Sequence, residues 1–109
     1  MSMLRTGYFF AKMTTRVVHC KREKYDIYIG RPSKWGNPFS EKDGTLAEFK
    51  VATREQAIEM FEAWILTQPE LMNELHTLKD KVLGCWCAPK ACHGDVLVRL
   101  INCHDKQEQ

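Results

Sequence analysis

The stretch "KVLGCWCAPKACHGDVL", residues 81–97, predicts the central part of the fold, because it is typical of a buried strand that leads into a helix. The apolar run 81–87 predicts the strand, and Pro89 ends it. A helix is expected from about Cys92 to Cys103, with these apolar side chains on one face: Val96, Leu97, Leu100 and Ile101. The same stretch holds three of the chain's five cysteines, so it is also where chemistry is expected.

Two more strands are expected upstream of this stretch. Residues 14–20, "TTRVVHC", are rich in β-branched side chains, and residues 25–30, "YDIYIG", alternate in polarity. The Lys-Arg-Glu-Lys run between them fits either a β-hairpin or a short crossover. Residues 30–40, "GRPSKWGNPFS", form a loop by their Gly, Pro and Ser content, and residues 48–52 predict a short edge strand.

The helix predicted over residues 53–68 has the strongest pattern, because Thr53 and Gln56 form a capping box ahead of apolar residues at helical spacing. Pro69 suits the first turn of a second, shorter helix. The order strand, strand, loop, helix, helix, strand, helix predicts a small single-domain α/β sandwich of Rossmann-like type. Its sheet has three or four strands, mostly parallel or mixed, and about three helices cover it.

Composition limits the class of protein. A chain of 109 residues is long enough for one domain, here 14–104, with 1–13 as an N-terminal extension and 105–109 as a frayed tail. There is no apolar run of about 18 residues and no convincing signal peptide, so we expect a cytoplasmic protein without membrane contact. The net charge of +2 gives no overall case for non-specific nucleic-acid binding.

Two unusual loops follow two of the predicted strands, at residues 30–39 and 88–95. Ligands of open α/β sheets bind at the carboxyl ends of the strands. If the two strands are parallel neighbours, both loops therefore meet at one edge of the sheet and form a binding site.

The expected ligand of that site is a phosphorylated, ring-bearing molecule: a nucleotide, a nucleoside or a nucleic-acid component. Arg31 and Lys34 offer charge, Trp35 a stacking surface and Asn37 a bidentate amide, while the helix start at residues 92–95 allows close approach of an anion. In the alternative reading, Trp35 pins the loop to the core and Asn37 only makes a turn. The predicted ligand-binding residues are Gly30, Arg31, Ser33, Lys34, Trp35, Gly36, Asn37 and Gly94.

The cysteine cluster has three interpretations. The donors Cys85, Cys87, Cys92 and His93 are chemically suited to zinc, although their spacing is not that of the usual paired knuckles, and His19 or Cys20 could complete a set.

In the second interpretation, the helix start activates Cys92 as a nucleophile, with His93 as its base and Asp95 as the residue that orients the base or caps the helix. In the third, the thiols are core residues, which we expect of Cys103 in particular, and Trp86 is also expected in the core.

The segments "YDIYIGRPSKWGNPF", "TREQAIEMFEAW" and "LGCWCAPKACHGDVL" closely resemble the family called domain of unknown function 4326, found in bacteria and their phages. The resemblance covers roughly residues 15–103 and leaves 1–13 outside the domain. It implies no activity, substrate or cofactor, and only marks the two loops as defining features of the family.

Three functions therefore stand open. The first is a site for a nucleotide-type ligand, with or without catalysis by Cys92 and His93. The second is a zinc-stabilised module that binds nucleic acid or protein without turnover. The third is a phage or host accessory protein whose surface binds a partner and whose cysteines are core.

Overall fold

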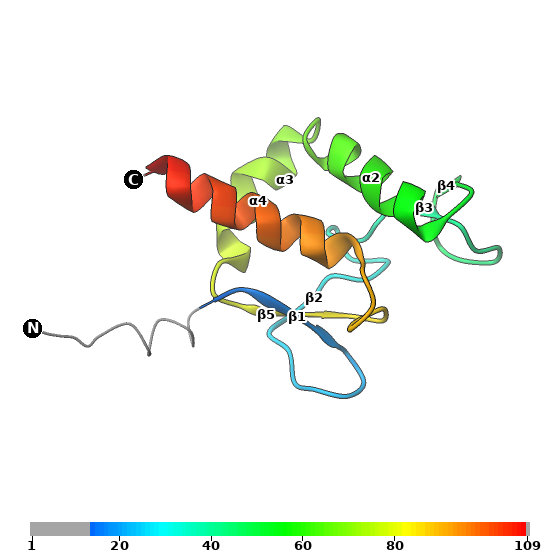
Figure 1. The fold of residues 1–109 in the computed structure, drawn as a ribbon, viewed down its shortest axis with the longest axis horizontal. Helices are drawn as coiled ribbons and strands as arrows, with labels where there is room; N and C mark the ends of the chain where they lie inside the picture. Colours follow the sequence, from blue (N-terminus) through cyan, green and yellow to red (C-terminus); the bar gives the residue numbers. More distant parts are fainter. Residues whose placement is uncertain (1–13, 109) are drawn as a thin grey trace, which may run out of the picture.

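Three short parallel strands form the main sheet of the computed structural model, which describes residues 14–108 (Figure 1). The strand order is β1 (Arg16–His19), β5 (Val82–Cys85), β2 (Ile27–Tyr28), so the strand predicted within 81–87 is central. Val17 and Ile27 both lie opposite Leu83, one from each side. The predicted extension 1–13 lies outside the described residues.

The link between β1 and β2 is a crossover and not a hairpin, because both strands pair with β5 and not with each other. β5 takes the central position since Leu83, Gly84 and Cys85 are all buried. Asp26 fastens the start of β2: its Oδ2 accepts from the Val82 amide at 2.8 Å, and its own amide donates to the Val82 carbonyl at 2.7 Å.

A second, two-stranded parallel sheet pairs β3 (Phe39–Ser40) with β4 (Phe49–Lys50). The edge strand predicted at 48–52 therefore forms, but in a sheet of its own. The rings of Phe39 and Phe49 stack with their centroids 5.3 Å apart. This small sheet places residues 41–48 beside the carboxyl end of the main sheet, where Figure 1 shows β3 and β4 next to the start of α2.

The helices are α2 (Arg54–Ile65), α3 (Pro69–Glu74), the 3₁₀ turn η2 (Leu75–Leu78) and α4 (His93–Glu108). The Thr53 hydroxyl accepts from the Gln56 amide at 3.0 Å, and the Gln56 side chain accepts from the Ala52 amide at 2.8 Å, so the predicted cap of α2 is present. The predicted short helix at Pro69 is α3. No helix among the described residues is long and apolar enough to cross a membrane.

The helices lie on one side of the main sheet, with α4 packed between β1 and α2 (Figure 1). Gly94 allows this packing, since a Cβ there would lie 2.9 Å from side-chain carbons of Ile29 and Val17. Phe61, Ile65 and Leu97 fill the space between the helices and the sheet without any exposure to solvent. The predicted α/β fold class is confirmed.

Three expectations near the C-terminal half are wrong. Cys103 is exposed and not part of the core, and α4 continues through Glu108 because no Gly or Pro ends it after Cys103. Trp86 is 55% exposed, because β5 ends at Cys85 and the alternation of a strand no longer applies to the next residue.

Candidate functional site

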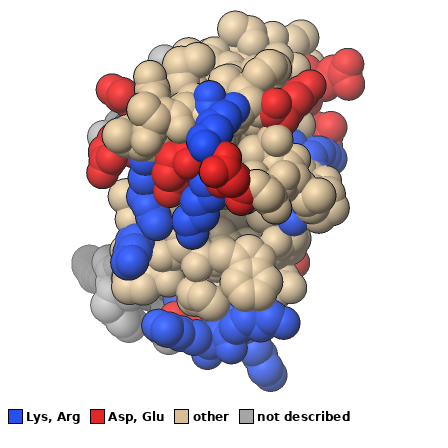
Figure 2. Space-filling view, turned by 90° about the vertical axis from the view of Figure 1, so that its right-hand side faces the viewer, with Lys and Arg blue, Asp and Glu red and all other residues tan. Residues whose placement is uncertain are grey.

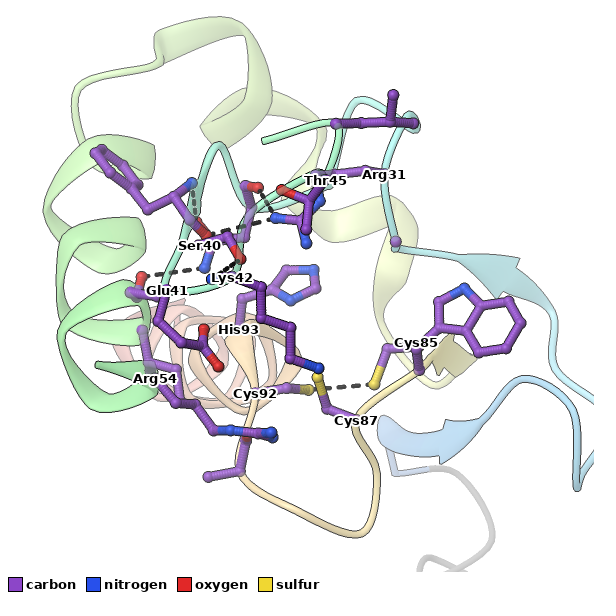
Figure 3. Close-up of a pocket in the computed structure, with 18 of the residues that line it drawn as sticks. Arg31, Ser40, Glu41, Lys42, Thr45, Arg54, Cys85, Cys87, Cys92 and His93 are labelled. Carbon is purple, nitrogen blue, oxygen red and sulfur yellow. Dashed lines mark hydrogen bonds between the residues drawn. The ribbon is translucent and has the colours of Figure 1, made fainter. Parts of the chain in front are cut away.

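A cavity of about 330 Å³ opens at the carboxyl ends of β2 and β5 (Figure 3). β2 and β5 are parallel neighbours, and residues that follow each of them line the cavity, including Arg31 from one loop and Cys87 from the other. The rest of the wall comes from residues 39–46 and from the first half of α2. The two predicted loops thus meet at one edge of the sheet. Residues 39–46 and the first half of α2, which the sequence analysis did not assign to a site, complete the cavity.

Basic side chains dominate the charge of this wall. Of the described residues that line the cavity, Arg31, Lys42 and Arg54 are cationic and Glu41 is the acidic one. Figure 3 shows the Lys42 and Arg54 side chains extending toward the sulfur atoms. Figure 2 views the molecule from the side to which the strands point, and shows Lys and Arg side chains gathered among acidic ones across this face.

Sequence reasoning missed Lys42, Arg54 and Glu41. Strands β3 and β4 bring residues 41 and 42 to the cavity. Each strand has only two residues, too few for a periodic pattern in the sequence. The signal that could have found Arg54 is its place at the start of a strongly predicted helix, directly after the cap at Thr53.

Of the two charged residues predicted to bind the ligand, Arg31 lines the cavity and Lys34 does not. The Arg31 Nη1 donates to the Asn37 carbonyl at 2.7 Å and to the Phe39 carbonyl at 3.4 Å, which fixes the guanidinium across the loop. Gly36 permits this arrangement, since a Cβ there would lie 3.1 Å from the Arg31 backbone. Gly30 also lines the cavity, and a Cβ there would collide with the Tyr28 hydroxyl at 2.3 Å.

The other predicted residues of this loop hold the loop to the protein. Trp35 is 3% exposed and belongs to the core, so its ring is not free to stack on a ligand. Asn37 lines the cavity but is buried, and both ends of its amide are used: Nδ2 donates to the Ala57 carbonyl at 3.0 Å, and Oδ1 accepts from the Phe39 amide at 2.9 Å. Lys34 forms an ion pair with Glu74 away from the cavity.

Ser33 and Gly94, also predicted to bind the ligand, do not line the cavity. The Ser33 hydroxyl is buried without a hydrogen-bond partner among the described residues, and it does not line the cavity. Gly94 is buried against the sheet, and its amide donates to Cys92 Sγ at 3.3 Å. The start of α4 is therefore capped from within, and the cations on the cavity wall are better placed than its amides to receive an anion.

Cys85 and Cys92 contact each other at the back of the cavity, with their sulfur atoms 3.2 Å apart. The Cys92 amide donates to Asp95 Oδ2 at 3.1 Å, so the Asp95 side chain caps the start of α4. The Gly94 amide, which donates to Cys92 Sγ, completes a reciprocal pair of capping contacts. Asp95 is exposed and does not line the cavity with Cys92 and His93. Of its two predicted roles, the structure shows the cap and not the orientation of His93.

The His93 ring packs between the loop after β2 and α2. Its Nε2 lies 2.7 Å from the Ile29 carbonyl, and its ring meets Phe61 edge-on at a centroid distance of 5.0 Å. A carbonyl only accepts, so Nε2 carries the proton, and Cys92 Sγ is bonded to Cys85 and the Gly94 amide and not to the His93 ring. Burial lowers the pKa of His93, and the hydrogen bond to Ile29 opposes that shift in part.

The pKa values of the two thiols, Cys85 and Cys92, shift in opposite directions. The hydrogen bond from Cys92 lowers the pKa of Cys85 to about 6, and backbone hydrogen bonds from Ala88 and Cys87 act in the same direction. The same hydrogen bond raises the pKa of Cys92, and burial adds to the rise. Cys85 is therefore the more acidic thiol of the pair, whereas the sequence pointed to Cys92.

Cys87 is half-buried on the cavity wall, and burial together with the charge of Cys85 raises its pKa. Arg54 and Lys42 act in the opposite direction, which places both cations within electrostatic reach of this sulfur.

The predicted zinc ligands do not converge. Among the side chains that the structure describes, no group of three or more His, Cys, Asp and Glu residues is arranged to hold a metal ion. Cys85 and Cys92 do meet, but the His93 ring turns to the Ile29 carbonyl. The zinc set Cys85, Cys87, Cys92 and His93 thus lacks the tetrahedral geometry that it requires.

The fold and cavity define a small α/β protein with a basic site at the strand ends. The chain belongs to the family described as "Domain of unknown function (DUF4326)", which matches residues 14–103. It is 31% identical over 101 residues to the "Uncharacterized 12.4 kDa protein in nrdA-td intergenic region" of Enterobacteria phage T4, an alignment that covers 89% of this chain and 86% of the relative.

A second relative comes from Acanthamoeba polyphaga mimivirus. It is the "Uncharacterized protein R718", 31% identical over 116 residues, covering 84% of this chain and 83% of the viral protein. No solved structure gives a significant match to the chain.

Proposed function

We propose that the cavity at the strand ends binds a phosphorylated, ring-bearing ligand of the nucleotide class, such as a mononucleotide or the end of a nucleic acid. The observation that supports this most is the set of Arg31, Lys42 and Arg54 on one cavity wall. Three cations against the carboxylate of Glu41 favour an anion, and the carboxyl ends of parallel strands are where α/β proteins bind such ligands.

The phosphate belongs near Lys42 and Arg54. Lys42 is exposed, and Arg54 is half-buried, with its Nη1 3.4 Å from the Ala91 carbonyl, so its other guanidinium nitrogens remain able to donate to a phosphate. Arg31 already donates to two carbonyls through Nη1, so it contributes positive electrostatic potential more than direct contact with the phosphate. This placement replaces the one at the start of α4, whose Gly94 amide is in use.

The ring of the ligand belongs on the aromatic part of the wall. Tyr28, Phe39 and Trp86 line the cavity, and the Trp86 indole donates to the Tyr28 hydroxyl at 2.8 Å, which holds two of these rings together. A volume of about 330 Å³ lies at the lower end of the range of roughly 300–1,000 Å³ for small-molecule sites. It suits one nucleotide and not a long strand.

The chemistry beside such a ligand is that of thiols. Cys85, Cys87 and Cys92 all line the cavity, and Cys85 has the lowered pKa. A nucleophilic role therefore suits Cys85 better than a Cys92–His93 pair, because the His93 ring is bonded to the Ile29 carbonyl and not to Cys92.

Calorimetric titration tests the proposal. The four common ribonucleoside 5′-monophosphates are compared with the matching nucleosides and with inorganic phosphate. We expect at least one monophosphate to bind more tightly than both its nucleoside and phosphate alone. Lys42→Gln and Arg54→Gln each weaken that binding by about 10- to 100-fold, since a hydrogen bond to a charged group contributes about 1.5–3 kcal/mol.

Lys50→Gln is the matched control, because Lys50 is exposed, pairs with Asp43 and does not line the cavity. It leaves the affinity unchanged. Absence of binding by every monophosphate at millimolar concentration, or equal losses in the Lys42 and Lys50 variants, overturns the proposal.

A further inference from the structure

The two thiols at the back of the cavity come from different elements and are held in contact. Cys85 ends β5 and Cys92 directly precedes α4, seven residues later, and their sulfurs are 3.2 Å apart. A disulfide bond is about 2.05 Å long, so the sulfurs need to approach by little more than 1 Å. The connecting loop contains the exposed residues Trp86, Lys90 and Ala91, which leaves room for this movement.

The surroundings of each sulfur suit a different step of thiol oxidation. Cys85 accepts a hydrogen bond from Cys92 and from the backbone at Ala88 and Cys87, which stabilises its thiolate. Cys92 Sγ faces the Gly94 amide at the start of α4, where negative charge on sulfur is favoured once the proton has left. The first sulfur is therefore a nucleophile and the second a resolving thiol.

Access to the pair runs through the cavity. Cys85 is 1% exposed and Cys92 is 3% exposed, yet both line the cavity wall. A small oxidant the size of hydrogen peroxide fits a space of about 330 Å³, whereas the burial shields the pair from bulky reagents. Lys42 and Arg54 on the same wall give it the positive potential in which thiolates react.

We propose that Cys85 and Cys92 form a redox-active dithiol, which a peroxide oxidises to a disulfide and an external dithiol reduces again. This property is independent of the nucleotide-type ligand proposed above.

Oxidation takes two steps that balance. The Cys85 thiol first releases its proton to water. Its thiolate attacks one oxygen of hydrogen peroxide, an S–O bond forms, the O–O bond breaks, and the departing hydroxide takes up a proton from the solvent, equivalent to the one released, to become water. Cys92 sulfur then attacks the Cys85 sulfenic acid, an S–S bond forms, the S–O bond breaks, and hydroxide leaves as water with the Cys92 proton. In sum, two thiols and one peroxide give one disulfide and two waters.

Peptide mapping of the full chain tests the proposal. The protein is treated with excess hydrogen peroxide, its remaining thiols are blocked with N-ethylmaleimide, and a tryptic digest is analysed without reduction. Trypsin cuts after Lys90, so a Cys85–Cys92 disulfide joins the peptides 82–90 and 91–99. We expect this joined pair, with fragment ions that assign the bond to Cys85, and its disappearance on addition of dithiothreitol.

Two variants sharpen the result. Cys92→Ser prevents the cross-link and leaves a Cys85 sulfenic acid, which dimedone traps when the peroxide has been removed and the chain is unfolded in its presence. Cys103→Ser, at an exposed thiol on α4, leaves the cross-link intact. The proposal is overturned if Cys85 and Cys92 remain reduced in excess peroxide, whether or not Cys103 is oxidised, or if the disulfide in the unmodified chain joins Cys87 to either of them. Because the main readout uses the unmodified chain, it does not depend on folding of the variants.

Discussion

The loops after β2 and after β5 leave the same edge of the sheet, and they use their polar residues in opposite ways. In the first loop, Trp35 and Asn37 are buried and hold the loop to α2 and the core. In the second, Trp86 is exposed and the sulfurs of Cys85 and Cys92 meet on the cavity wall. Residue types that suit a ligand thus serve the loop's own conformation where the loop is long and turns back on the protein.

The cations that the first loop was expected to provide come largely from elsewhere. Lys34 pairs with Glu74 outside the cavity, while Lys42 and Arg54 reach it from the segment before β4 and from α2. The first loop is therefore mainly structural, and the second carries the thiols. Variants in each loop, compared for stability and ligand affinity, test this difference.

The largest expected effect is on stability, and it separates the two tryptophans. Trp35→Ala lowers the free energy of unfolding by about 3–5 kcal/mol, because it empties a core position that is 3% exposed. Trp86→Ala, at 55% exposure, lowers it by less than about 1 kcal/mol. Urea denaturation of both variants checks this, and similar losses for the two would show that the loops do not differ as described.

A smaller effect separates Asn37 from Lys34 within the first loop. Asn37→Ala removes two hydrogen bonds at a buried site and leaves the Ala57 carbonyl and the Phe39 amide without them, which costs about 1–3 kcal/mol. Lys34→Ala breaks an exposed ion pair and costs about 0–1 kcal/mol. The same denaturation assay compares them; a greater loss at Lys34 would contradict the structural role of Asn37.

Cys85 makes stability depend on pH. Its pKa in the folded protein is about 6, below the ordinary 9.0, so its contribution is fully present above pH 9 and is lost as the pH falls toward 6. Between pH 6 and 8 the free energy of unfolding therefore rises by at most about 1.4 kcal/mol per pH unit on account of this group. The raised pKa of Cys92 acts only above pH 9, outside this window.

Denaturation at several pH values, with Cys85→Ser for comparison, measures this slope. Ultraviolet absorbance of the thiolate at 240 nm should also titrate near pH 6 in the unmodified chain and not in the variant. His93, whose pKa is lowered, removes stability below pH 6.5 in both proteins, so it cancels in the comparison. A first thiolate that appears only near pH 9 would contradict the account of the pair.

The smallest effect concerns Asp95, which the structure assigns to the cap of α4. Asp95→Asn weakens the bond from the Cys92 amide and the favourable charge at the helix start, and should cost about 0.5–1 kcal/mol. Ligand affinity should not change, because Asp95 lies outside the cavity. Loss of affinity without loss of stability would contradict the capping role and show that Asp95 contributes to ligand binding.

Much of the fold could be predicted because its signals are local. The buried run at β5, the capping box at Thr53 and the proline that begins α3 each specify an element from a few neighbouring residues. The meeting of the two loops followed from a general rule of parallel sheets.

The composition of the cavity wall could not be predicted in the same way. Lys42 reaches it only because β3 and β4 pair across two residues each, and no sequence pattern marks so short a sheet. The burial of Trp35 depends on how far its loop folds back onto the core, which the Gly and Pro residues permit but do not specify. The contact between Cys85 and Cys92 likewise depends on the turn after β5.

The most direct test of the central claim is a map of ligand-induced changes in the amide ¹H–¹⁵N NMR spectrum on addition of a nucleoside monophosphate. The account predicts the largest shifts at residues 39–46, at the start of α2 and at residues 85–93, with little change in α3 or around Lys34. Shifts confined to the basic turn at residues 21–24, or spread evenly over the surface, would contradict a nucleotide-type site in this cavity.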